Sequence, residues 1–123
     1  MTIYEVEEAL KRYKHSKSEA EFVLRRIERL KEAGICLQER EKELNDKYRQ
    51  ALLKVDDELG MCLVLINSLD NIDNDVEVLT KYHIDGLTDK VIAKQLHINH
   101  DYMRTKRRRA YAKIGKKFKE LPN

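Results

Sequence analysis

The chain has 123 residues, a formal net charge of +3 and a charged fraction of 38%. This length suffices for one small domain, or for a small domain with a helical appendage, and it excludes a large multi-domain architecture. Four Gly, one Pro and no Trp, with apolar residues recurring at helical spacing, favour long helices over sheets or disorder. We therefore predict an all-α fold.

No segment of the sequence has the pattern of a signal peptide or a membrane span. The first ten residues are acidic, and the most apolar stretch, residues 61–69, is far too short to cross a bilayer. We therefore expect a cytoplasmic protein without a membrane partner. Cys36 and Cys62 have no second Cys or His at ligand spacing, so we expect small buried hydrophobic residues, with no metal and no cofactor.

The first 34 residues follow a helical pattern. Thr2 and Glu5 have the spacing of a capping box, and Ser18 and Glu21 repeat that spacing, which predicts the start of a second helix. Gly34 is typical of a helix end.

The longest helical pattern follows Gly34. Its apolar residues alternate steps of four and three, as in a helix seam pressed against another helix. The seam consists of Tyr48, Leu52, Val55, Leu59, Cys62, Ile66 and Leu69. Leu53, Leu63 and Leu65 widen this face, and Gly60 is a candidate kink. The pattern fits either an intramolecular bundle or an oligomerisation module. We favour a coiled-coil oligomerisation region over residues 1–70, forming a homodimer or a higher homo-oligomer.

Charge divides the chain at Asp70. Residues 1–70 carry a net charge of −2, and residues 71–123 carry +5. Within the second half, residues 99–119 hold nine Lys and Arg against a single acid, Asp101. This concentration of positive charge indicates a polyanionic partner.

Residues 71–123 divide into helix, turn, helix, tight turn and long helix. Asn74 or Asp75 is expected to cap the first helix, Thr88 the second and Asn99 the third. The residues expected to face inward are Val76, Leu79, Tyr82, Ile84, Val91, Ile92, Ala93, Leu96, Ile98, Met103, Ala110 and Ile114.

This pattern, "VLTKYHIDGLTDKVIAKQLHIN" followed by Met103, Ala110 and Ile114, resembles the helix-turn-helix of sigma-factor region four and of phage transcriptional regulators of the RinA and ArpU type. The resemblance covers about residues 75–115. It implies a DNA-binding domain over residues 71–123. For the phage regulators it implies late-gene activation, and for region four it implies contact with host RNA polymerase.

The chain departs from the family pattern at two positions. His97 stands where the turn usually has Gly, so we expect a left-handed backbone there. Arg107 stands where the family usually has an apolar residue, so we expect its stem to cover the core and its guanidinium to reach the surface.

A recognition helix of this kind meets base edges along one side and phosphates on its flanks. The candidate base-reading residues are His100, Asp101, Arg104, Thr105 and Arg108. The candidate phosphate-binding residues are Thr88, Lys90, Lys106, Arg109, Lys113, Lys116 and Lys117.

We therefore expect a sequence-specific regulator that binds double-stranded DNA as a dimer or higher oligomer, in the host cytoplasm if a phage encodes it. The sequence contains no Gly-rich phosphate loop, paired-His metal motif or nucleophile elbow, and its four His are dispersed at surface, turn or DNA-facing positions, so we expect no catalysis. Two other interpretations remain open. One is a DNA-packaging protein similar to a small terminase subunit, and the other is a helical adaptor whose basic end binds an acidic protein.

Overall fold

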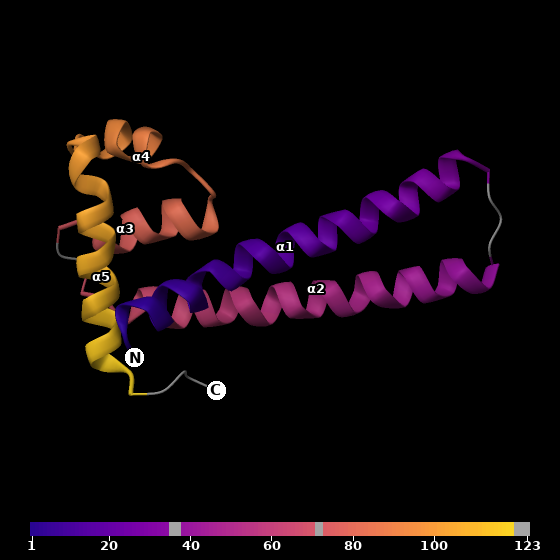
Figure 1. Cartoon of the computed structure of the whole chain (residues 1–123), viewed down its shortest axis with the longest axis horizontal. Helices are drawn as coiled ribbons and strands as arrows, with labels where there is room; N and C mark the ends of the chain where they lie inside the picture. The colour runs from indigo at the N-terminus through magenta and orange to yellow at the C-terminus, as the bar shows by residue number, and fades with distance from the viewer. Residues whose placement is uncertain (35–37, 71–72, 120–123) are drawn as a thin grey trace.

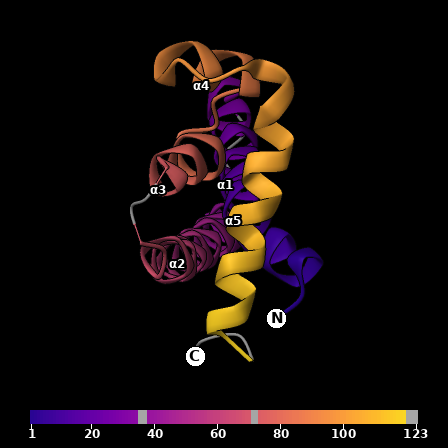
Figure 2. The same ribbon diagram turned by 90° about the vertical axis from the view of Figure 1, so that its left-hand side faces the viewer.

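The computed structural model describes residues 1–34, 38–70 and 73–119, and these residues form an all-α fold without a strand. Two long helices, α1 (Ile3–Glu32) and α2 (Gln38–Asn67), pair as an antiparallel hairpin (Figure 1). The remaining elements are α3 (Asp75–Leu79), the π-helix η1 (Thr80–Ile84), α4 (Asp89–Leu96), the 3₁₀ turn η2 (His100–Tyr102) and α5 (Met103–Lys117). They gather at the end of the hairpin where the N-terminus lies, and α5 crosses that end (Figure 2).

The predicted start of α1 is confirmed, but the predicted break within it is wrong. The Glu5 amide donates to the Thr2 hydroxyl, and the Thr2 amide donates to the Glu5 carboxylate, each at 3.1 Å. The helix continues through Ser18, because Ala20 and Ile27 are buried on the helix face that also carries the earlier core residues. A Ser-to-Glu spacing of three occurs equally well inside a continuous helix. Gly34 follows the helix with a φ of +66°, as its role as a terminator predicts.

The α2 helix is unbroken, and most of its predicted seam packs within the chain. Gly60 lies inside the helix without ending it. Of the seven seam residues, Cys62, Ile66 and Leu69 are buried, Tyr48, Val55 and Leu59 are half-buried, and Leu52 is 42% exposed. The buried part of the seam therefore forms an intramolecular core, which leaves a different face of α2 for any second subunit.

Cys62 is a small buried residue, as predicted. Its thiol donates to the Leu10 carbonyl oxygen at 3.5 Å, and burial raises its pKa to about 11. Cys36 lies outside the described residues.

Both halves of the sequence contribute to one main core. Its buried residues are Val6, Ala9, Leu10, Tyr13, Cys62, Leu65, Ile66, Leu69, Leu79, Ala110, Tyr111 and Ile114. The change of charge at Asp70 therefore does not separate two cores. The N-terminal amino group also donates to the Gly115 carbonyl oxygen at 3.1 Å. A Cβ at Gly115 would lie 2.3 Å from the Met1 carbonyl oxygen, so this close approach requires glycine.

A second, smaller cluster lies between α3, α4 and α5. It consists of Val78, Ile92, Ala93 and Met103. Val91, which we expected to face inward, is 40% exposed, because Ile92 and Ala93 occupy the inward side of this short helix. The cluster fixes α4 against the beginning of α5.

Candidate nucleic-acid interface

A tight turn positions α5 relative to α4. His97 has a φ of +56°, so its expected left-handed backbone is confirmed. The Asn99 side chain accepts from the Asp101 amide at 3.0 Å and thereby caps η2, which leads into α5. Met103, Ala110 and Ile114 are buried, as predicted for the inner side of the long helix. These contacts leave the opposite side of α5 toward solvent.

The five candidate base-reading residues all lie exposed on η2 and α5. They are His100, Asp101, Arg104, Thr105 and Arg108. Arg104 and Arg108 are about one helical turn apart, so both side chains project from the same side of α5. Among the ion pairs between described residues, neither arginine has a carboxylate partner. Each can therefore offer its donors to another molecule.

Two of the seven candidate phosphate-binding residues pair with the buried carboxylate of Asp75 instead. The Lys106 ammonium lies 3.4 Å from one Asp75 carboxylate oxygen, and the Lys113 ammonium lies 2.6 Å from the other. Lys106 is 8% exposed and Asp75 is 3% exposed. Lys106 is therefore a structural residue. Lys113 remains half-exposed, but its bond to Asp75 raises the pKa of its ammonium and occupies one of its donors.

Arg107 also differs from its expected role. Its guanidinium pairs with Asp89 and lies 4.1 Å from the centre of the Tyr82 ring. Only 12% of its side chain is exposed, so the expectation that this guanidinium reaches the surface is wrong. The acid and the aromatic ring together satisfy a cation that could not otherwise be buried.

The other phosphate candidates lie at the edges of the exposed side of α5 or on α4. Arg109 donates to the Tyr102 hydroxyl, and Lys117 donates to the Ser68 carbonyl oxygen. Lys116 and Lys90 are exposed. Thr88 caps α4 by accepting from the Val91 amide at 3.4 Å, as predicted.

Comparison with family models, curated proteins and solved structures gave no match. The helix-turn-helix resemblance therefore still depends on the residues that suggested it. None of the described helices combines the length and apolar character needed to cross a membrane.

The sequence did not predict the polar groups that contact the inward side of α5. Asp75, predicted as a candidate cap, turns its carboxylate to two lysines, and no side-chain bond caps α3. His83, expected at the surface or in a turn, is 5% exposed, and its Nε2 lies 2.7 Å from the Tyr111 hydroxyl. His83 follows Leu79 by four residues, which places it on the apolar side of its helix. That spacing was the one available signal.

Proposed function

We propose that the chain is a DNA-binding transcription regulator in which α5 enters the major groove. The observation that carries this proposal is the division of the α5 cations. Its inward cations are neutralised by Asp75 and Asp89, whereas Arg104 and Arg108 project together without a carboxylate partner among the described residues. A pair of guanidinium forks one turn apart suits bidentate contacts to guanine.

The positions around this pair suit phosphate contacts. Arg109, Lys116 and Lys90 lie exposed on α5 and α4, so they can bind the strands that border the groove. Arg109 is oriented by its bond to the Tyr102 hydroxyl. The resemblance to RinA and ArpU type regulators favours late-gene activation, and the resemblance to region four favours a contact with RNA polymerase in the host cytoplasm.

We further propose that two copies pair through α2. Leu52, Leu53, Leu63 and Val64 are between 42% and 54% exposed and lie on one side of this helix. An antiparallel second copy centred on Glu58 brings Leu52 and Leu53 of each copy beside Val64 and Leu63 of the other. Because the same apolar residues meet from both sides, the patch is self-complementary, which favours a second copy of the chain as the occupant.

The pairing can be tested by light scattering. Leu53→Glu combined with Val64→Glu should convert the dimer to a monomer with little change in helix content, because both positions are half-exposed. Phe22→Glu is the matched control, since Phe22 is 66% exposed on α1 and should leave the dimer intact. A wild-type monomer at micromolar concentration would contradict the pairing, and a ring of about eight or more subunits would favour the packaging interpretation.

Selection of bound duplexes from a random pool tests the regulator proposal. Two modules related by a twofold axis should select inverted half-sites whose centres lie about 10 base pairs, or a multiple of this distance, apart. A selected pool without any sequence preference would overturn sequence-specific regulation and would favour packaging. Failure to bind any duplex would favour the adaptor interpretation.

A further inference from the structure

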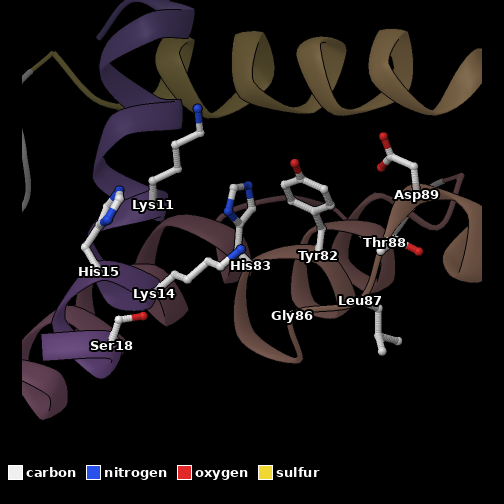
Figure 3. Close-up of a pocket in the computed structure, with 10 residues that line it drawn as sticks. All are labelled: Lys11, Lys14, His15, Ser18, Tyr82, His83, Gly86, Leu87, Thr88 and Asp89. Atoms are coloured by element: carbon white, nitrogen blue, oxygen red, sulfur yellow. The ribbon is translucent and has the colours of Figure 1, made fainter. Parts of the chain in front are cut away.

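A cleft of about 530 Å³ lies between α1 and the segment that joins η1 to α4 (Figure 3). Two turns of α1 contribute Lys11, Lys14, His15 and Ser18 to one wall. The facing wall includes Tyr82, His83, Leu87 and Thr88. The volume falls within the range of small-molecule sites, and the walls combine cations, hydroxyls and aromatic rings.

The α1 wall of the cleft carries lysines and no acid. Residues 9–18 of α1 contain four Lys and Arg and no acid. Glu7 pairs with Lys11 at 3.0 Å, whereas Lys14 and His15 form no ion pair with any described residue. Asp89 also lines the cleft, but its carboxylate is paired with Arg107. A ligand that enters therefore meets the Lys14 ammonium, which has no carboxylate partner among the described residues.

The back wall of the cleft separates it from the exposed side of α5. The Tyr82 ring packs against the Arg107 guanidinium, and the His83 ring bonds to the Tyr111 hydroxyl. Arg107 and Tyr111 both belong to the inward side of α5. The inward side of α5 therefore lies between this wall and the outward side that we assign to DNA.

We propose that this cleft binds a small anion in which a phosphate group is joined to a planar ring. Lys14, His15 and Ser18 lie within one turn of α1 and can donate to the phosphate oxygens. The planar ring packs against the Tyr82 side chain on the facing wall.

A ligand in the cleft also contacts groups that hold the recognition helix. Tyr82 and Asp89 line the cleft and together retain Arg107 of α5. A bound anion therefore lies beside the contacts that place α5. Binding of the anion does not depend on the proposed function.

Titration of the ¹⁵N-labelled full chain with adenosine monophosphate, and separately with inorganic phosphate, tests the site. Amide shifts should concentrate in residues 11–18 and 82–89, and the nucleotide should bind more tightly than phosphate. Lys14→Glu should weaken nucleotide binding by about tenfold or more, because it replaces a charged donor with a like charge. Lys17→Glu is the matched control, because Lys17 lies one turn away over the Tyr13 ring and does not line the cleft.

Three outcomes would overturn the proposal: no saturable shifts with either probe, equal weakening by both substitutions, or equal affinities for phosphate and nucleotide. Without any nucleotide, Lys14→Glu should retain wild-type DNA affinity. If the wild type binds nucleotide but no duplex, the proposed function alone is refuted. If the wild type binds DNA but no nucleotide, the proposed anion site alone is refuted.

Discussion

The four consecutive cations of α5 divide into two pairs with opposite surroundings. Lys106 and Arg107 face inward and pair with Asp75 and Asp89, whereas Arg108 and Arg109 are exposed and have no carboxylate partner among the described residues. A helix turns by about 100° per residue, so four consecutive side chains are distributed around its circumference. A run of like charge in a sequence is therefore not one surface.

Substitutions on the two sides of α5 should change different measured quantities. Changes on the inward side remove contacts that place the helix, so they should lower the free energy of unfolding. Changes on the outward side should lower DNA affinity and leave the fold intact. Each substitution below tests whether this separation holds.

The largest expected effect is that of Asp75→Asn on stability. Asn cannot neutralise Lys106, which is 8% exposed, so an uncompensated buried charge remains. We expect a loss of about 3 kcal/mol in the free energy of unfolding, measured by denaturant titration. The matched control is Asp73→Asn, at an exposed position, which should change stability by no more than about 0.5 kcal/mol. Equal effects would show that the Asp75 pairs contribute nothing to holding α5.

Low pH should lower the free energy of unfolding, because it favours protonation of His83. Burial, followed by the nearby Arg107, lowers the pKa of His83 to about 4. The unfolded imidazole binds a proton below about pH 6.5, whereas the folded imidazole does so only near pH 4. This contribution to stability is therefore fully present above pH 6.5 and is lost as the pH falls toward 4, up to about 3 kcal/mol.

Unfolding measured at several pH values tests this expectation. His83→Gln should have a shallower loss of stability between pH 6.5 and 4 than the wild type, whatever its stability at pH 7. The exposed His15, replaced in the same way, is the control. Identical pH dependence in the wild type and His83→Gln would rule out the buried neutral imidazole.

The sequence predicted the parts of this arrangement that depend on local spacing. The Thr2 capping box, the Thr88 cap and the left-handed His97 involve contacts within three or four residues, or a single backbone angle. The inward side of α5 was also correct at Met103 and Ile114, because helical periodicity determines it.

The tertiary polar pairs could not be predicted in the same way. Asp75 with Lys113, Asp89 with Arg107, and His83 with Tyr111 are separated by 18 to 38 residues. Periodicity assigns each residue to a side of its own helix, but the partner depends on how the helices cross. For this reason the sequence predicted phosphate contacts for Lys106 and Lys113, although the fold pairs both with Asp75.

On the outward side, Arg104→Ala should affect DNA and not the fold. We expect a loss of about 1 to 3 kcal/mol on the preferred duplex, with relaxed preference at one base pair. Its stability should stay within about 0.5 kcal/mol of the wild type, because Arg104 is exposed. Lys106→Ala should show the converse, with lower stability. Equal losses of Arg104→Ala on specific and random duplexes would place the reading side elsewhere.

The smallest expected effect is that of Lys116→Ala. Lys116 is exposed and forms no ion pair with a described residue, so its expected role is contact with a phosphate, which carries no sequence information. If each of two subunits neutralises about three phosphates, log affinity should fall against log salt with a slope of about −5. Lys116→Ala should weaken all duplexes alike and reduce this slope by about one per subunit, measured by titration on a single duplex. Lys113→Ala is the matched control, because Asp75 already occupies its ammonium, and it should change the slope less while lowering stability more. A larger change of slope for Lys113→Ala than for Lys116→Ala would mean that Asp75 releases its lysine on DNA binding, and the division between the two sides of α5 would not hold in the complex.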